Sequence, residues 1–167
     1  MRNRQKGFSL IELLVVVAII LIIAAIAIPN LLRSKMAANE SSSVGSLRTI
    51  NTAEVTYAAA YPNTGYSADV PSLGGDPATC ATTATTVAAC LIDNELALAT
   101  AAGTAKSGYF FTYNLNGAAG GINTAYTLQA SPANAGTTGQ RYFFTDQTGV
   151  IRYGLTGVAD TTSSAIQ

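Results

Sequence analysis

The segment that decides the fold runs from Lys6 to Asn30 and reads KGFSLIELLVVVAIILIIAAIAIPN. No polar side chain occurs between Leu13 and Ile28. The 21 residues 8–28 are apolar except for Ser9 and Glu12, and Glu12 is their one ionisable side chain. As a helix rising about 1.5 Å per residue, they would measure about 30 Å, enough to span the hydrocarbon core of a bilayer. The segment is therefore predicted to be a membrane-length helix with a carboxylate near its start.

The charges of the chain are distributed unevenly around this segment. Arg2, Arg4 and Lys6 precede it and are three of the nine basic residues, so the chain from Phe8 onward has a formal charge of −3. A weakly acidic body argues against nucleic acid as a partner, since nucleic-acid binding needs clustered Lys and Arg. The basic cluster instead indicates that the N-terminus stays in the cytoplasm.

The helical pattern continues beyond the apolar segment. Pro29 removes a backbone donor and is expected to kink or locally loosen the helix. Apolar side chains then recur at spacings of threes and fours, which predicts an amphipathic helix to about Ala60, stopped by Pro62 and Gly65. These apolar positions are Leu32, Met36, Val44, Leu47, Ile50, Tyr57 and Tyr61.

The second half of the chain changes character. Residues 62–107 are rich in Ala and Thr and are predicted to be a variable loop region, with a short helix at 91–102. Aromatic and alternating segments follow in residues 108–167, and two of them flank Gln147-Thr148-Gly149, a hairpin signal. The predicted fold class is α+β: a long N-terminal α-helix, membrane-spanning in its first half, packed on an antiparallel β-sheet of three or four strands.

Three interpretations of the N-terminus compete. A secretory signal peptide is supported by the basic start, the apolar stretch and the small-x-small site Ala25-Ile26-Ala27. That reading predicts a secreted enzyme or binding module whose mature chain begins at Ile28, and it leaves Glu12 unexplained. A simple membrane anchor is the second interpretation.

The third interpretation accounts for more residues. The junction Lys6-Gly7-Phe8, followed by Glu12, the apolar run and Pro29, resembles the leader-peptide junction of type IV pilins and of the pseudopilins of type II secretion. The resemblance covers about residues 1–60. It implies that residues 1–7 are a leader, that prepilin peptidase cuts between Gly7 and Phe8, and that Phe8 is N-methylated. It also implies a pilin-like lollipop, with 8–28 as transmembrane and assembly helix and 29–61 as its amphipathic continuation.

Glu12 has a chemical role in this interpretation. A carboxylate in a lipid-facing helix is costly and is usually functional, unless it merely lies at the membrane surface. Cutting after Gly7 would create an α-amine on Phe8, one helical turn before Glu12. In a stack of parallel helices, the amine of one subunit can pair with the carboxylate of its neighbour and fix the axial register. By the resemblance, Gly7 gives the peptidase access to the scissile bond, and Pro29 accompanies local melting that lets the filament pack.

Other chemistry has little support in the sequence. With no histidine and two cysteines, neither a zinc site nor a His-dependent nucleophile is available, so no catalytic, metal or cofactor residue is predicted. Cys80 and Cys90 are predicted to form a disulfide, as suits a domain facing the periplasm. Pilins often carry a disulfide near the C-terminus, whereas this pair lies in the middle of the globular part.

The resemblance implies a structural subunit that polymerises into a type IV pilus-type surface filament, in roles such as adhesion or motility. The alternative is a pseudopilin of a type II secretion system. The expected partners are copies of the chain itself, prepilin peptidase, the pilus assembly machinery of the inner membrane, and lipid before assembly. The precursor is expected in the bacterial inner membrane with its globular domain in the periplasm, and the subunit then in an extracellular filament.

Overall fold

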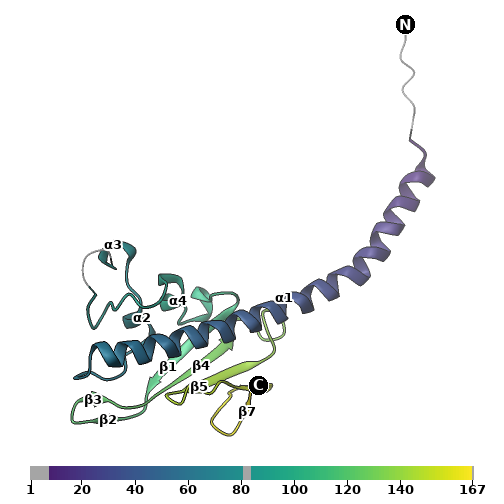
Figure 1. Cartoon of the computed structure of the whole chain (residues 1–167). Coiled ribbons are helices and arrows are strands. Elements are labelled where there is room, and N and C mark those ends of the chain that lie inside the picture. Colours follow the sequence, from purple (N-terminus) through teal and green to yellow (C-terminus); the bar gives the residue numbers. More distant parts are fainter. Residues whose placement is uncertain (1–7, 81–83, 167) are drawn as a thin grey trace. The chain divides into compact units, whose positions relative to one another are not determined.

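The structure is a computed structural model that describes residues 8–80 and 84–166 (Figure 1). The chain divides into two units, Met1–Lys35 and Met36–Gln167. Helix α1, Leu10–Ala60, contributes its first part to one unit and its second part to the other. Gly7, half of the expected cleavage site, lies outside the described residues.

Helix α1 confirms the predicted helical segment and its C-terminal end. It contains 51 residues and ends two residues before Pro62, which cannot donate the next backbone hydrogen bond. Pro29 lies inside this helix. The kink expected at Pro29 remains a prediction.

The second unit contains the predicted antiparallel sheet (Figure 1). Its strands follow the order β1-β4-β5-β6-β7, and every neighbouring pair is antiparallel. The strands are β1 (Tyr109–Leu115), β4 (Tyr126–Pro132), β5 (Tyr142–Asp146), β6 (Arg152–Gly154) and β7 (Ser164–Ala165). Four of them coincide with the aromatic segments of the sequence, and the two-residue β7 makes a fifth strand where three or four were expected.

The register of the sheet follows the alternation of side chains. In β4 every second residue is buried, so one face of the strand points into the core. Phe111 of β1 pairs with Ala130, and Leu128 pairs with Thr145 of β5. The predicted β5–β6 hairpin is present, and Gly149 supplies the positive φ of 74° that its turn requires.

A small second sheet follows β1. Its strands are β2 (Ala118–Ala119) and β3 (Ile122–Asn123). Gly65, just after α1, bridges to Asn123 with φ at 76°, and a Cβ there would lie 2.1 Å from the carbonyl oxygen of Asn123. The end of α1 is thus tied to this hairpin through a position that only glycine can fill.

The region between α1 and β1 contains more helix than expected. Its elements are α2 (Val70–Leu73), α3 (Pro77–Cys80), α4 (Asn94–Leu98) and the 3-10 helix η1 (Ala102–Thr104). The helix expected over residues 91–102 is therefore shorter and is followed by a separate turn. Asp93 explains where α4 begins, because its side chain accepts a hydrogen bond from the Leu96 amide.

The core lies between α1 and the main sheet. The side chains of Leu47 and Ile50 on α1 and of Leu128 on β4 are fully buried. A polar link crosses this core: Nδ2 of Asn51 donates to Oγ1 of Thr145 at 2.9 Å. The amphipathic second half of α1 is thus the part of the helix that the sheet covers.

Candidate assembly site at the N-terminal helix

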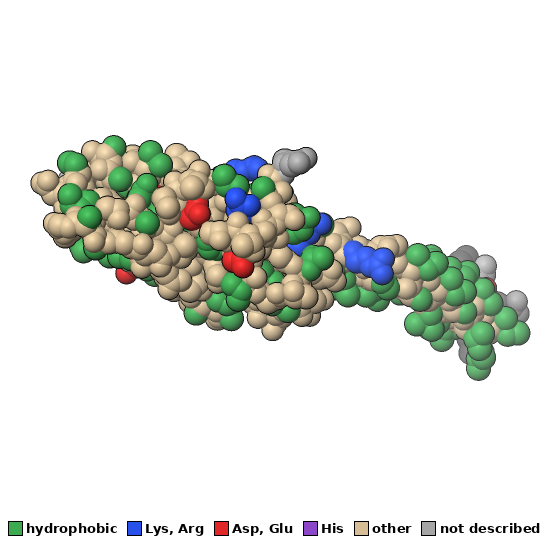
Figure 2. All heavy atoms as spheres, turned by 90° about the horizontal axis from the view of Figure 1, so that it is seen from below, with side chains coloured by type: hydrophobic (Ala, Val, Ile, Leu, Met, Phe, Trp, Pro, Cys, Tyr) green, Lys and Arg blue, Asp and Glu red, His purple; other side chains and the backbone are tan. Residues whose placement is uncertain are grey.

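The apolar side chains of α1 in the first unit are exposed. Leu10, Leu21 and Ile26 are each more than 60% exposed, and no residue of the most apolar window of α1 is buried. That window spans 18 residues with a mean hydropathy of 3.3. Figure 2 shows the resulting apolar surface along the N-terminal part of α1. Among the described residues, α1 is the one helix long and apolar enough to cross a membrane.

Glu12 lies at the start of this apolar helix. Its carboxylate Oε2 accepts a hydrogen bond of 3.0 Å from the backbone amide of Ser9, the residue that precedes α1. This contact is half of a capping box, in which the carboxylate at the third helical position satisfies the amide of the N-cap residue. The pattern Ser-x-x-Glu at residues 9–12 is typical of a capping box, and this local role of Glu12 was not predicted from the sequence.

The two described members of the predicted N-terminal site, Phe8 and Glu12, are within one helical turn of each other in sequence. Phe8 precedes the helix and is 74% exposed. The amide that Glu12 accepts belongs to Ser9, the residue that follows Phe8. Helix N-termini also favour negative charge nearby, which suits Glu12 in this position.

The cysteines form the predicted disulfide. Cys80 and Cys90 are bonded, with their Cα atoms 5.7 Å apart. Gly75 packs directly against the bridge, and a Cβ at this position would lie 2.6 Å from the sulfur of Cys80. The disulfide therefore braces the region between α2 and α4, far in sequence from both Glu12 and the C-terminus.

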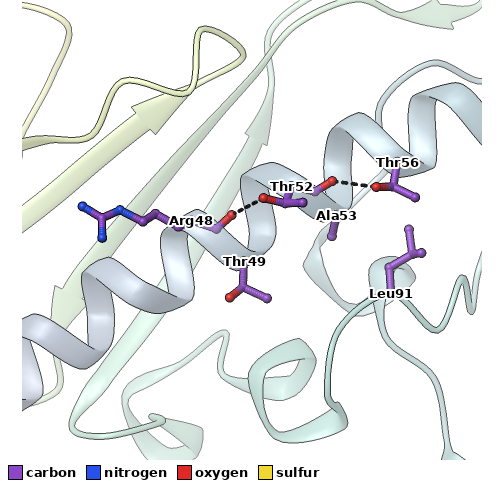
Figure 3. A pocket seen from close by; sticks show the side chains of 6 residues that line it. All are labelled: Arg48, Thr49, Thr52, Ala53, Thr56 and Leu91. Carbon is purple, nitrogen blue, oxygen red and sulfur yellow. Dashed lines mark hydrogen bonds between the residues drawn. The ribbon is translucent and has the colours of Figure 1, made fainter.

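A hollow lies along the second half of α1. Figure 3 shows it lined by small and hydroxylated side chains with one guanidinium, from Arg48, Thr49, Thr52, Ala53, Thr56 and Leu91. The hydroxyls of Thr52 and Thr56 donate to backbone oxygens one turn earlier, at 2.9 Å each. No group of three metal-binding side chains occurs within residues 8–80 and 84–166.

One buried ionisable residue was missed by the sequence interpretation. Glu54 lies on the core-facing side of α1 and is fully buried. The signal was its spacing: Ile50, Glu54 and Tyr57 follow one another at the four- and three-residue intervals of the apolar stripe. A carboxylate at such a position is either paired or neutral.

Comparison with known proteins points to the same N-terminal segment. The family described as "Prokaryotic N-terminal methylation motif" matches residues 2–28. The type IV wide pilus major component PilA4 of Thermus thermophilus is 61% identical over 41 residues, which are 25% of this chain and 30% of that protein. The type IV major pilin protein PilA of Myxococcus xanthus is 44% identical over 54 residues, 32% of this chain and 24% of that protein.

A third relative gives the same picture. The type IV major fimbrial protein FimA of Dichelobacter nodosus is 50% identical over 52 residues, 29% of this chain and 33% of that protein. The matched segment thus spans only about a quarter to a third of these relatives. No solved structure matches the chain.

The fold and the N-terminal segment together define a class of protein. An exposed apolar helix begins with a capping glutamate and continues into an α+β unit whose antiparallel sheet covers its second half. The N-terminal segment carries the methylation motif and is similar in sequence to the same segment of type IV major pilins.

Proposed function

We propose that this chain is a structural subunit that polymerises through its N-terminal helix into a type IV pilus-type surface filament. The observation that carries the proposal is the apolar N-terminal part of α1, in whose most apolar window no residue is buried, with a single carboxylate at its start. Lipid covers this helix before assembly, and the helices of neighbouring subunits cover it afterwards. The matched relatives are named as pilins, which favours a pilus subunit over a pseudopilin.

Processing precedes assembly in this proposal. Prepilin peptidase cuts between Gly7 and Phe8, and the new amine of Phe8 is methylated. The match to the methylation motif over residues 2–28 supports this step. The continuity of α1 from Leu10 to Ala60 also supports it, because a cut at Ile28 would divide a single helix.

Glu12 then registers the subunits. In a stack of parallel helices, the amine of an incoming Phe8 meets the Glu12 carboxylate of a neighbour where water is excluded. There an unpaired charge costs several kcal/mol, so misaligned subunits are disfavoured. The peptidase and the assembly machinery act on the precursor in the inner membrane, with the globular unit in the periplasm, before the subunit enters an extracellular filament.

Three substitutions of Glu12 separate pairing from helix capping. Glu12→Gln keeps an oxygen that can accept from the Ser9 amide but removes the charge. Glu12→Leu removes both, and Glu12→Asp keeps the charge with a shorter reach. We expect all three to be inserted and cleaved, with filament numbers falling sharply for Gln and Leu and partially for Asp.

The measurement is intact mass for processing and electron microscopy for filament counts. The mature chain should begin at methylated Phe8. Filaments formed normally by processed Glu12→Gln would show that the carboxylate acts only as a local cap. A mature chain starting at Ile28 would refute the pilin function as a whole.

A further inference from the structure

Glu54 is a buried carboxyl group without a cation. Its side chain has no exposed surface and faces the turn that joins α1 to α2. Within the part of the chain that the structure describes, the Lys–carboxylate and Arg–carboxylate pairs are Lys106–Asp93 and Arg141–Glu40. A buried ionised carboxylate needs such a partner, or else it takes up a proton.

The number of donors and acceptors around Glu54 indicates whether its carboxyl group is protonated. Oγ of Ser67 lies 2.5 Å from Oε1 of Glu54 and 2.9 Å from the backbone oxygen of Asp69. A serine hydroxyl has one proton and can donate to only one of these two oxygens. If Glu54 is protonated, its O–H donates to Ser67, and the Ser67 hydroxyl is free to donate to Asp69.

The remaining carboxyl oxygen is satisfied in the same arrangement. Oε2 of Glu54 accepts the backbone amide of Ser67 at 3.0 Å. Every polar atom of the pair then has a partner, as a buried pair requires. With an ionised Glu54, either Oε1 or the Asp69 oxygen loses its donor in a site closed to water.

In the described part of the chain, the ionisable groups that face Glu54 from the surrounding elements include no positive charge. They are the phenols of Tyr57 on α1, Tyr113 on β1 and Tyr126 on β4, with Asp69 at the start of α2 as the nearby carboxylate. The phenol hydroxyls donate elsewhere: Tyr57 to the Thr86 oxygen at 2.7 Å, Tyr113 to the Ser67 oxygen at 3.1 Å and Tyr126 to Asn51 at 3.0 Å.

We propose that Glu54 carries a proton in the folded protein at neutral pH and acts as a pH-sensitive latch between α1 and the turn of residues 62–69. Burial raises the pKa of Glu54, and the hydrogen bonds from Ser67 together with the Tyr113 hydroxyl lower it by less. The folded state therefore binds a proton that the unfolded state releases at a lower pH. The stability that this contributes is complete below the unfolded pKa and is lost as the pH rises through the folded pKa.

The latch connects more than two residues. The turn that Ser67 closes also holds the β2–β3 hairpin, because the Tyr66 amide donates to the Asn123 oxygen at 3.0 Å and the Asn123 amide to the Thr64 oxygen at 2.8 Å. Deprotonation of Glu54 at high pH should therefore loosen the turn and this hairpin together. The rest of the sheet has its own pairing and should remain ordered.

Titration of the glutamates tests the proton directly. The full chain in detergent micelles, labelled with ¹³C at the glutamate carboxyl carbon, gives four signals, from Glu12, Glu40, Glu54 and Glu95. Glu54→Gln assigns its signal by deletion, and Ser67→Ala assigns it by displacement. We expect the Glu54 signal at pH 7 to be that of a protonated carboxyl, because burial disfavours the ionised form. The signal of an ionised Glu54 carboxylate at pH 7 would overturn the proposal.

Stability of two glutamine variants provides the second test. Glu54→Gln can donate its amide to Ser67 and accept the Ser67 amide, so every bond of the protonated pair is kept. Its melting temperature should equal or exceed that of the natural chain at pH 8, and its pH dependence should be flatter. Glu40→Gln is the matched control on the same helix, because Glu40 pairs with Arg141 and should lose stability at pH 8. A Glu54→Gln loss as large as that of Glu40→Gln would show that Glu54 is ionised.

Discussion

The phenol hydroxyl of Tyr126 donates a hydrogen bond of 3.0 Å to Oδ1 of Asn51. This contact joins β4 to the second half of α1 inside the core, and the other end of the same amide donates to Thr145 on β5. The side-chain amide of Asn51 therefore forms hydrogen bonds with two strands at once. Polar links of this kind specify how the helix sits on the sheet, whereas apolar contacts tolerate sliding.

Removing the Tyr126 hydroxyl should test this link. Tyr126→Phe keeps the ring and its stacking on Tyr113 but leaves the half-buried Oδ1 of Asn51 without this donor. We expect a loss of about 1 kcal/mol in the free energy of unfolding. The measurement is thermal or denaturant unfolding of the full chain in detergent. Tyr61→Phe is the control, because its hydroxyl makes no hydrogen bond within residues 8–80 and 84–166, and it should change stability little.

The disulfide should contribute to stability independently of this core. Replacing both Cys80 and Cys90 by Ser should lower the free energy of unfolding by about 3 kcal/mol, since the bridge closes a short loop in the unfolded chain. Reduction of the disulfide should lower the free energy of unfolding of the natural chain by a similar amount, and its melting temperature should fall accordingly. The double variant should not respond to reductant, and a natural chain equally indifferent to reduction would contradict a stabilising bridge.

The sequence predicted those parts of the fold that depend on a repeating pattern. The three- and four-residue spacing of Leu47, Ile50 and Tyr57 located the buried face of α1, and the aromatic segments located four strands. Both succeed because burial selects side chains with the period of the element. The two-residue strand β7 was missed because so short a segment carries no period.

The candidate site could be proposed from the sequence for a different reason, and its role stays a prediction. Phe8 and Glu12 belong to a motif of fixed spacing, so they could be named without knowledge of the fold. Glu54 could not be understood from sequence, because its state depends on Ser67 and on tyrosines of β1 and β4 that only the tertiary fold brings together. The local cap between Ser9 and Glu12 was within reach of the sequence, since it depends only on neighbours.

Two glycines should respond in opposite directions to the same substitution. Gly65→Ala places a Cβ 2.1 Å from the Asn123 oxygen in a residue with φ of 76°, so we expect a large loss of stability and disorder of the β2–β3 hairpin. Gly45→Ala lies within α1 with nothing within 4 Å of the new Cβ. It should stabilise the helix by up to about 1 kcal/mol. Unfolding curves of the two variants provide the comparison, and equal effects would mean that backbone entropy alone governs both sites.

The ion pair of Asp93 should show a pH dependence opposite in sign to that of Glu54. Desolvation tends to raise the pKa of Asp93, but the hydrogen bonds from Lys106 and from the Leu96 amide together hold it below its usual value. The stability that Asp93 contributes is therefore present above the unfolded pKa and is lost as the pH falls through the folded pKa. Asp93→Ala removes both the cap of α4 and the 2.7 Å pair with Lys106, which is partly exposed and screened by solvent.

The loss for Asp93→Ala should be about 1 kcal/mol at pH 7, mostly from the cap, and should become smaller as the pH falls through the lowered pKa of the natural Asp93 carboxyl. Asp93→Asn is the matched control, because asparagine can cap the helix without a charge. It should retain most of the stability at pH 7 and show the weaker acid dependence of the alanine variant. Melting curves of the three chains at pH 3, 5 and 7 decide this, and a loss for Asp93→Asn as large as that for Asp93→Ala would assign the stability to the charge instead of the cap.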